Sequence, residues 1–305
     1  MKIAVMGAGA IGSLIGGLLA DRGFDIILIS RRVSHMEAIA ESGLRISGVS
    51  GKRDVRVKAY TDPSKVGPCG LVLLTVKAYD TRQALADSEP LLSKNTSVLS
   101  LQNGLGNFEQ VIAAVGRMRA LVGVTSHGAF LVSNGEVRHT GQGTTYIGSI
   151  STLARRTVEK VVYLFRNASL EARVAEDVRA TIWRKVLVNL AINAPTALSG
   201  LRNGQLLDNP GLRWVMKKVV QEGEEVCRGL GVRVEKGAIE EAFAVAKRTS
   251  ENFSSMLQDI KRGRRTEIDF LNGRVVVMGE EMGLSLPVNK VLTSLVRARE
   301  GRQIA

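Results

Sequence analysis

Three polar residues recur at every fourth position of the segment RKVLVNLAIN, residues 184 to 193: Lys185, Asn189 and Asn193. This spacing predicts a helix on which the three side chains lie along one face. Apart from the opening basic pair, the other residues are apolar, so we expect this face to line a cleft rather than a solvated surface. A desolvated lysine is suited to protonating an oxygen that gains negative charge, and neutral amides can hold the substrate.

A glycine-rich turn near the start of the sequence predicts a phosphate site. Residues 2 to 6, KIAVM, suit a buried strand, and an apolar helical segment follows the turn. Gly7 would permit the tight turn, Gly9 would let the backbone approach a pyrophosphate, and Gly12 would let helix and strand pack closely. The helix N-terminus would offer free N–H groups to the phosphates. The residues predicted to contact the dinucleotide are Gly7, Ala8, Gly9, Ala10, Ile11 and Gly12.

The end of the next predicted strand, residues 25 to 30, bears on the choice of cofactor. An NAD enzyme usually places an aspartate or glutamate there to accept a hydrogen bond from the adenosine ribose. This sequence has Ser30, Arg31 and Arg32 instead, with no carboxylate to repel a 2′-phosphate. We therefore predict NADP(H) as the cofactor and Arg31 as its main phosphate contact. The alternative is that both arginines are ordinary surface residues.

Further strands lead into other candidate residues. Lys77 and Asn103 each follow a buried strand, at the edge where an open parallel sheet binds its ligand, so we expect both near the nicotinamide or the substrate. After Gly123 the pattern alternates, and we expect antiparallel strands that close the edge of the sheet. His127 and His139 in this region have no nucleophile or metal partner in the sequence, and we interpret both as structural.

The 305 residues, 45% of them hydrophobic, suffice for two domains with sizeable cores. Strand patterns fill residues 1 to 175, and long helical periods fill residues 176 to 305. The predicted fold is an α/β Rossmann-type nucleotide domain followed by an all-α substrate domain. Cys69 and Cys227 lie far apart and form no zinc-ligand pattern, which favours a reducing, cytoplasmic setting without disulfides or a metal site.

The net charge of +13 raises the question of nucleic acid. The basic residues are spread along the chain, and the densest run, KRGRR at 261 to 265, contains no aromatic residue for base stacking. We interpret the charge as a solvated face or as attraction for anionic small substrates, with no nucleic-acid partner. The apolar run after Lys2 looks like a signal peptide or membrane helix, but Asp21 and Arg22 end it short of bilayer length. We therefore expect no membrane association.

The helical half contains two further polar motifs, SSMLQD and TEIDFLNG. Ser254 or Ser255 at a helix start would offer a hydroxyl and backbone N–H groups to a carboxylate, or would act as a plain N-cap. Glu267 is open to the same alternative, a surface residue at a helix N-terminus. The helix that carries Lys185 is expected to break at residues 193 to 204, which places Asn203 in the loop after it.

Six segments in order, spread over nearly the whole chain, resemble the ketopantoate reductase (2-dehydropantoate 2-reductase) family: GAGAIG, VKAYD, QNGLG, WRKVLVNLAINAPTAL, SSMLQD and TEIDFLNG. The resemblance implies NADPH-dependent reduction of 2-dehydropantoate to (R)-pantoate in pantothenate and coenzyme A biosynthesis. It also implies a helical domain similar to the C-terminal domain of 6-phosphogluconate dehydrogenase.

The resemblance further assigns roles. It makes Lys185 the proton donor and places Glu267 near the reacting centre and the cofactor ribose. Ser255 would meet the substrate carboxylate. The residues implied to contact the substrate are Asn189, Asn193 and Asn203, and those implied on the cofactor side are Lys77, Asn103 and Ala129.

Alternatives stay open at this point. The motifs recognise a 2-oxo acid more securely than its tail, so a reductase of another branched 2-oxo acid, or another NADP-dependent hydroxyacid dehydrogenase, would share them. A non-enzymatic dinucleotide-sensing or nucleic-acid-binding protein would share the glycine turn and the charge but would leave the row at Lys185 without a use. The apolar helical half is compatible with a homodimer.

Overall fold

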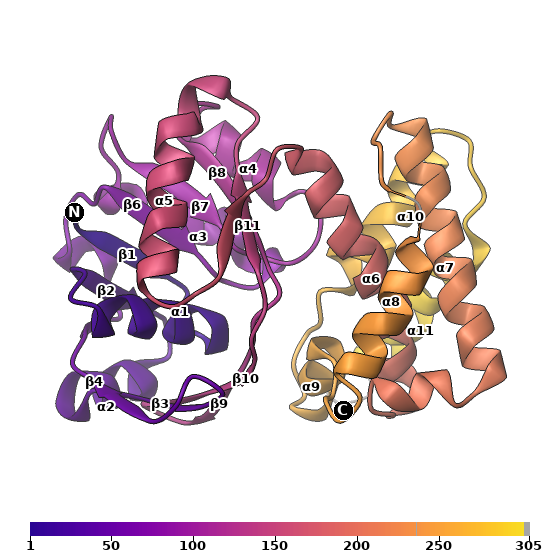
Figure 1. Ribbon diagram of the computed structural model, residues 1–305, viewed down its shortest axis with the longest axis horizontal. Helices are drawn as coiled ribbons and strands as arrows, with labels where there is room; N and C mark the ends of the chain where they lie inside the picture. Colours follow the sequence, from indigo (N-terminus) through magenta and orange to yellow (C-terminus); the bar gives the residue numbers. More distant parts are fainter. Residues whose placement is uncertain (236, 302–305) are drawn as a thin grey trace. The chain divides into compact units, whose positions relative to one another are not determined.

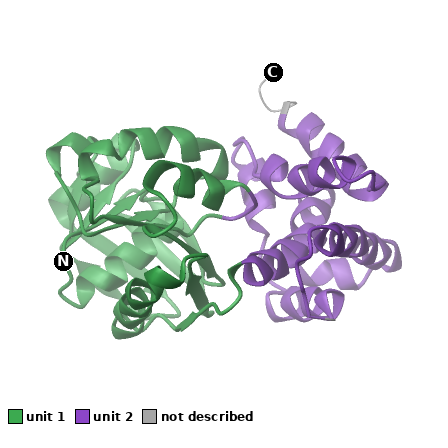
Figure 2. Cartoon of the chain, turned by 90° about the horizontal axis from the view of Figure 1, so that it is seen from above, with its two compact units in different colours: residues 1–102, 106–178 green, residues 103–105, 179–305 purple. Residues whose placement is uncertain are grey.

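The computed structural model describes residues 1–235 and 237–301, which fold into the two compact units coloured in Figure 2. Unit 1 comprises Met1–Gln102 and Gly106–Val178. Unit 2 comprises Asn103–Leu105 and the described residues from Arg179 onward. Residues 236 and 302–305 of the predicted helical domain lie outside the described residues.

The main sheet of unit 1 has the strand order β12-β11-β8-β7-β6-β1-β2-β5. The six strands from β8 to β5 in this order are parallel, whereas β11 is antiparallel to β8 and parallel to β12. The order reverses between β1 and β6, which confirms the predicted Rossmann-type sheet. The strands are β1 (Ile3–Met6), β2 (Ile26–Ile29), β5 (Lys58–Tyr60), β6 (Leu71–Leu74), β7 (Ser97–Ser100), β8 (Ala120–Thr125), β11 (Thr145–Gly148) and β12 (Ala172–Val174).

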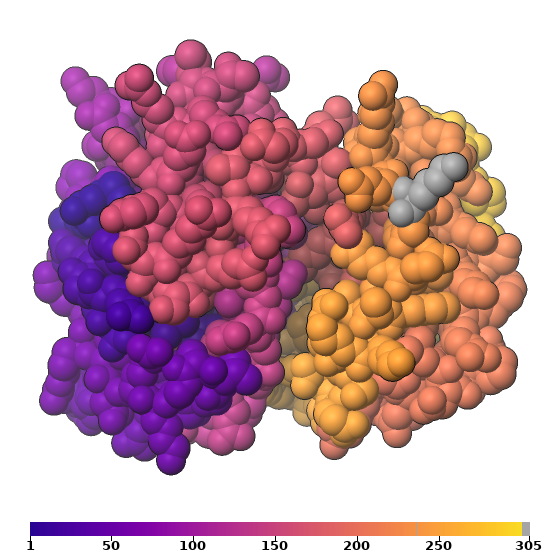
Figure 3. All heavy atoms as spheres, viewed as in Figure 1, coloured from indigo at the N-terminus to yellow at the C-terminus, as the bar shows by residue number. Residues whose placement is uncertain are grey.

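Helices cover both faces of this sheet (Figure 1). In helix α5, the buried residues Val158, Val161, Val162 and Phe165 form an apolar stripe that packs on the strands, as the helical period requires. In the space-filling view, atoms of the α5 region form part of the surface of unit 1 (Figure 3). The α-helices are α1 (Ala10–Asp21), α2 (Val33–Ser42), α3 (Thr81–Asp87), α4 (Asn107–Val115) and α5 (Arg155–Asn167). The short 3-10 helices are η1 (Pro63–Lys65), η2 (Ala78–Asp80), η3 (Glu89–Leu91) and η4 (Thr152–Ala154).

A second sheet corrects the prediction for the region after Gly123. Its order is β4-β3-β10-β9, whereas β11 and β12 extend the main sheet beyond β8, with β11 antiparallel to β8. The hairpin β9–β10 instead joins β3, because β10 pairs with β3 in parallel. The strands are β3 (Leu44–Gly48), β4 (Arg53–Val55), β9 (Gly128–Ser133) and β10 (Glu136–Gly141).

Helix α1 explains why the second sheet forms there. The helix is apolar all round, so a single sheet cannot bury it. Gly16 lies against the main sheet, where a Cβ would be 2.5 Å from Leu28 Cδ2, and Gly17 lies against β3, where a Cβ would be 2.6 Å from Leu44 Cδ2. Small residues thus allow close packing of α1 on two sheets. The run that looks like a membrane segment is a core helix.

Unit 2 is helical, as predicted. Helix α6 does not break at residue 193 but continues through Pro195 to Ser199, which corrects the predicted boundary. Proline has no N–H to continue the helix ladder, and two hydroxyls near it bond back along the helix. Thr196 Oγ1 donates to Ile192 O at 2.7 Å, and Ser199 Oγ donates to Pro195 O at 2.8 Å. The elements are α6 (Val178–Ser199), η5 (Gly204–Leu207), α7 (Pro210–Gly229), α8 (Ala238–Arg248), α9 (Ser255–Lys261), η6 (Ile268–Phe270), α10 (Asn272–Glu280) and α11 (Pro287–Gly301).

A buried carboxylate fixes the start of α11. Glu222 of α7 is 8% exposed and accepts hydrogen bonds from the backbone N–H groups of Val288 and Asn289, both at 2.9 Å. The Asn289 side chain donates a third bond to it at 2.7 Å. These bonds satisfy amides that a helix N-terminus leaves without partners. No helix within the described ranges is both long enough and apolar enough to cross a membrane.

Candidate active site

The glycine-rich turn is fixed by close contacts. Gly7 has a φ of +103°, and a Cβ there would lie 2.6 Å from Val76 Cγ1. A Cβ at Gly12 would lie 2.5 Å from Gly7 O. Thr75, just after β6, donates its hydroxyl to Gly7 O at 2.8 Å, a contact that the motif alone did not predict. The fold itself therefore requires glycine at positions 7 and 12.

Gly9 differs from the other two glycines. A Cβ there would have only Gly7 O within 4 Å, at 3.9 Å, so packing does not demand a glycine. In the part of the chain that the structure describes, no side chain caps α1, whose first-turn amides run from Ala10 through Ile11 to Gly12. The space beside Gly9 and these amides fit a pyrophosphate. The amide of Ala8, by contrast, is bonded within the fold to Ile29 O at 2.9 Å.

Arg31 follows β2 and is paired with a carboxylate that the sequence analysis missed. Its Nη2 lies 2.8 Å from Asp80 Oδ1, and 66% of the Arg31 side chain is exposed. Asp80 ends the short helix η2, for which Lys77 is the N-terminal cap. Ser30, Arg31 and Arg32, which follow β2, include no aspartate or glutamate, as expected from the sequence. The expectation that no carboxylate lies near Arg31 was wrong, because Asp80 is in contact with it. Asp80 reaches Arg31 from the segment after β6.

The remaining candidates of unit 1 lie on or directly beside the second sheet. Ala129 of β9 is half-buried and is the register partner of His139. His127 Nδ1 lies 3.0 Å from His139 Nε2, and both rings are buried. Burial lowers the pKa of His139. The two histidines therefore form a buried pair at one end of the β9–β10 hairpin, and their structural role stays a prediction.

A third histidine links this hairpin to the glycine turn. His35 is fully buried, and its Nδ1 accepts a hydrogen bond from Gly135 N–H at 2.9 Å. Its Nε2 lies 3.1 Å from Ser13 Oγ, which is itself 3.2 Å from Ala8 O. An amide can only donate, so Nδ1 is unprotonated and Nε2 carries the proton. Burial, followed by the Arg32 charge, lowers the pKa of His35 to about 4.

Helix α6 carries the predicted polar row. Lys185 and Asn189 are half-buried, and Asn193 is 6% exposed, so the row is not a solvated stripe. Burial lowers the pKa of Lys185 to about 8, and the charge of Glu267 opposes this fall. A lysine that titrates in this range can both hold and release a proton near neutral pH.

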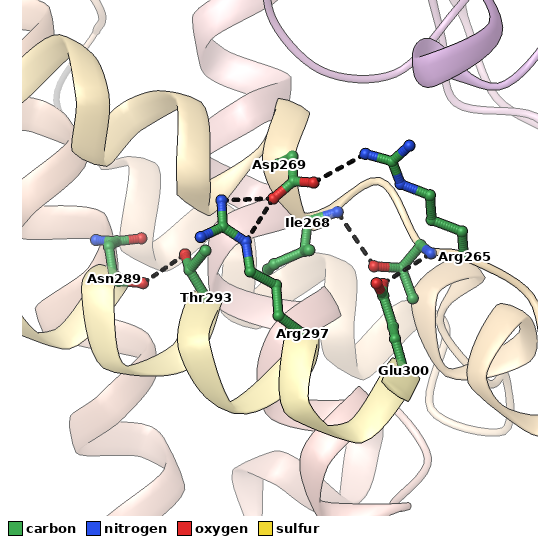
Figure 4. A network of polar contacts seen from close by, with 8 residues as sticks. Arg265, Ile268, Asp269, Asn289, Thr293, Arg297 and Glu300 are labelled. Carbon is green, nitrogen blue, oxygen red and sulfur yellow. Dashed lines mark hydrogen bonds and ion pairs between the residues drawn. The ribbon is translucent and has the colours of Figure 1, made fainter. Parts of the chain in front are cut away.

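Glu267 is 6% exposed, so the alternative of a surface residue is wrong. It directly precedes η6, and the contacts that hold its neighbours appear in Figure 4. These contacts join Asp269 to Arg265 at 3.1 Å and to Arg297 at 2.7 Å, and the Thr266 amide to Glu300 Oε1 at 2.8 Å. The contacts of Arg297 and Glu300 anchor the backbone around Glu267 to helix α11, and the contact of Arg265 lies within the segment itself.

The two predicted serines differ in their surroundings. Ser254 is the N-cap of α9, because its Oγ accepts a bond from Leu257 N–H at 3.1 Å. The same Oγ lies 2.6 Å from Thr196 Oγ1 of α6, a link that the sequence analysis missed. Ser255, next in sequence, is exposed. Ser254 therefore joins α9 to α6, and Ser255 is the serine whose side chain is accessible.

Two asparagines complete the set in unit 2. Asn203 is 7% exposed, and its Nδ2 donates to Thr249 Oγ1 at 2.9 Å. Its Oδ1 has no hydrogen-bond partner among the described residues, which leaves an acceptor for a ligand or a water molecule. Asn103 belongs to the short segment Asn103–Leu105 of unit 2. This segment is held by a hydrogen bond from Leu105 N–H to Phe270 O at 2.8 Å, and Phe270 lies three residues after Glu267.

Each unit therefore holds its own group of predicted residues. In unit 1 the structure gathers the glycine turn and the Arg31–Asp80 pair at the ends of β1, β2 and β6. Unit 2 holds the lysine row of α6, Glu267, the two serines, Asn203 and Asn103. Within unit 2, electrostatic coupling joins Lys185 to Glu267, and hydrogen bonds join α6 to the start of α9.

Comparison with known proteins identifies the family. The models described as "Ketopantoate reductase PanE/ApbA" and "Ketopantoate reductase PanE/ApbA C terminal" match residues 3–152 and 177–300. The 2-dehydropantoate 2-reductases of Pyrococcus horikoshii and Archaeoglobus fulgidus are 40% and 39% identical to this chain, with 98% of each chain covered.

Solved structures extend the likeness to the whole fold. A PanE/ApbA family ketopantoate reductase from Ralstonia eutropha matches with a TM-score of 0.93 and 36% identity, with 100% of both chains covered. A D-mandelate dehydrogenase in a ternary structure with NADH and anilino(oxo)acetate matches with a TM-score of 0.93 and 26% identity over the same share of both chains. From the matched residues and the full-length relatives, we conclude that the chain belongs to the ketopantoate reductase PanE/ApbA family.

Proposed function

We propose that the chain is an NADPH-dependent reductase that converts 2-dehydropantoate to (R)-pantoate, in the cytoplasm, as a step of pantothenate and coenzyme A biosynthesis. The observation that carries the proposal is the half-buried Lys185, with a pKa lowered to about 8, in one row with Asn189 and Asn193. Full-length relatives named 2-dehydropantoate 2-reductase support the choice of substrate. In this proposal, residues 1–175 hold the cofactor and residues 176–305 hold the substrate.

The acid chemistry is assigned to Lys185. Bound NADPH supplies the hydride that reduces the C2 carbonyl carbon. The carbonyl oxygen then gains negative charge, which the Lys185 ammonium stabilises before its Nζ donates the proton. Glu267 favours the protonated form of this lysine against the effect of burial. The product is an alcohol, and the lysine regains its proton from solvent.

Neutral groups around the lysine hold the substrate. The amides of Asn189 and Asn193 supply hydrogen bonds without a second charge that would compete for the proton. Asn203 Oδ1 is a buried acceptor with no hydrogen-bond donor beside it among the described residues. A substrate hydroxyl could donate a hydrogen bond to it. Ser255, whose side chain is exposed at the start of α9, is assigned to the carboxylate.

The preference for NADPH is assigned to Arg31. Its guanidinium is largely exposed after β2, at the place where the adenosine ribose lies in this class of sheet. The fork of N–H donors suits a 2′-phosphate. The glycine turn and the uncapped α1 would hold the pyrophosphate. Lys77, Asn103 and Ala129 are assigned to the nicotinamide side.

A substrate panel tests the proposal. Cofactor oxidation would be followed with 2-dehydropantoate and two other branched 2-oxo acids, each with NADPH and with NADH. We expect fast turnover only with NADPH and 2-dehydropantoate. Turnover restricted to another acid would refute the assigned substrate, and the absence of turnover with every pair would refute the reductase.

A matched pair of variants on α6 tests the proton donor. We expect Lys185→Ala to lower kcat by about a hundredfold or more, with little change in the Kd for NADPH. Arg184→Ala is the control, since the exposed Arg184 pairs with Glu241 at 2.5 Å. It should retain nearly full activity. Wild-type turnover in Lys185→Ala would exclude the assigned role.

A second candidate follows from the D-mandelate dehydrogenase likeness. That protein was solved with NADH and anilino(oxo)acetate, so its fold, shared at a TM-score of 0.93, also serves another 2-oxo acid and the unphosphorylated cofactor. This chain would then reduce an aromatic or branched 2-oxo acid with NADH. Adding benzoylformate to the substrate panel separates this candidate from the first.

A further inference from the structure

The pair formed by Arg31 and Asp80 spans the nucleotide end of the main sheet. Strand β1 lies between β2 and β6, and Met6 is the register partner of both Ile29 and Leu74. The three strands therefore end at one level, with the glycine turn at the centre. Arg31 follows β2 on one side of this turn, and Asp80 follows β6 on the other.

The contact between the two side chains is a charged hydrogen bond. Arg31 Nη2 lies 2.8 Å from Asp80 Oδ1, and 31% of the Asp80 side chain is exposed. The hydrogen bond with Asp80, and then its charge, raises the pKa of the Arg31 guanidinium, with smaller contributions from Asp87 and Tyr79. The carboxylate thus neutralises the cation assigned to the 2′-phosphate and occupies part of its donor fork.

We propose that Asp80 is a specificity-determining residue that competes with the 2′-phosphate of NADPH for Arg31 and so limits the preference for NADPH over NADH. The inference rests on the proposed function, because it takes Arg31 as the phosphate contact. An unphosphorylated ribose leaves the pair intact. A 2′-phosphate brings a dianion close to the Asp80 carboxylate and must share or displace it.

Removal of this carboxylate has a defined consequence. In Asp80→Asn, the side chain keeps its size and loses its charge, so Arg31 loses its ion-pair partner and keeps only the weaker influence of Asp87 and Tyr79. The Kd for NADPH should fall by about three- to fivefold, near the upper end of the range expected for a partly exposed charge pair, and the Kd for NADH should stay within about 1.5-fold.

Equilibrium binding of the full chain provides the test, and it needs no turnover. NADPH, NADH and 2′,5′-ADP would be titrated into the wild type, Asp80→Asn, Arg31→Ala and the double variant. We expect Asp80→Asn to tighten NADPH and 2′,5′-ADP selectively, and we expect this gain to vanish when Arg31 is absent. Asp87→Asn is the matched charge control, because its influence on Arg31 is weaker, and it should change the NADPH/NADH ratio less.

The outcomes separate the inference from the proposed function. Equal changes for NADPH and NADH in Asp80→Asn, or a gain that persists without Arg31, would overturn the inference while the proposed cofactor stands. Wild-type protein that binds neither nucleotide would refute the proposed function, and the inference with it. Retained NADH binding in each variant shows that the nucleotide unit is folded.

Discussion

Acid should destabilise unit 1 through one buried histidine. His35 is fully buried with a pKa of about 4, against 6.5 for an unperturbed histidine. Because the folded-state pKa is the lower one, the neutral ring is favoured by folding. The stabilisation is fully present above pH 6.5 and is lost as the pH falls toward 4. At 1.36 kcal/mol per pKa unit, the loss is about 3 kcal/mol.

The loss has a structural origin. Protonation of Nδ1 would place a second N–H against the Gly135 amide, which can only donate. His35→Asn is the informative variant, because its Oδ1 can replace Nδ1 as the acceptor and cannot titrate. It forgoes the contact with Ser13 and should cost about 1 kcal/mol at neutral pH. Between pH 6.5 and 4 it should lose about 3 kcal/mol less than the wild type.

The assay must report on unit 1 alone. Trp183 and Trp214, the two tryptophans of the chain, both lie in unit 2, so tryptophan fluorescence would follow the other unit. Urea unfolding would instead be followed by pulsed hydrogen exchange of peptides that contain β1 and β2. Carboxylates contribute to acid unfolding of both the wild type and His35→Asn. The difference between the two in stability lost with falling pH therefore isolates the contribution of His35. Equal losses in wild type and variant over this pH range would refute the reasoning.

Three further predictions concern the site and its support. The kcat/KM for reduction should fall above about pH 8 as Lys185 loses its proton. Because the charge of Glu267 raises the pKa of Lys185, Glu267→Gln should move this fall to lower pH. A pH–rate profile that is the same in Glu267→Gln and wild type would contradict this. Glu222→Gln should lower the stability of unit 2 by about 1 to 3 kcal/mol, measured by urea unfolding with tryptophan fluorescence, because it weakens the cap on α11. Gly12→Ala should destabilise unit 1, whereas Gly9→Ala should leave its stability nearly unchanged and weaken NADPH binding. Thermal unfolding and NADPH titration measure the two effects. A larger loss of stability in Gly9→Ala than in Gly12→Ala would contradict the roles given to these glycines.

Local patterns predicted the nucleotide end and the lysine row. In the glycine turn and in the row from Lys185 to Asn193, successive residues lie within four positions of one another. The spacing in the sequence therefore determines how the residues of each group are arranged. The continuation of α6 through Pro195 was missed because proline normally ends a helix. Here Ala194 and Ala197, on either side of it, are fully buried in the core of unit 2, which the local pattern does not show.

Long-range pairings were out of reach of the sequence. The parallel register of β10 with β3 brings Glu136 beside Arg45, and no periodicity within either strand specifies that partner. The contact of Arg31 with Asp80 depends on the order of strands in the sheet. The burial of Glu267 depends likewise on packing within unit 2, and spacing alone left a surface position equally open.

The double burial of α1 bears on how the chain is made on the ribosome. Synthesis runs from the N-terminal end, so α1 is complete long before β10, which begins at Glu136, leaves the exit tunnel. Until then one flank of a helix as apolar as a targeting segment lacks its native cover. For most of that interval only β3 and β4 of the second sheet are available to cover this flank, so slow synthesis between β3 and β10 would prolong its exposure.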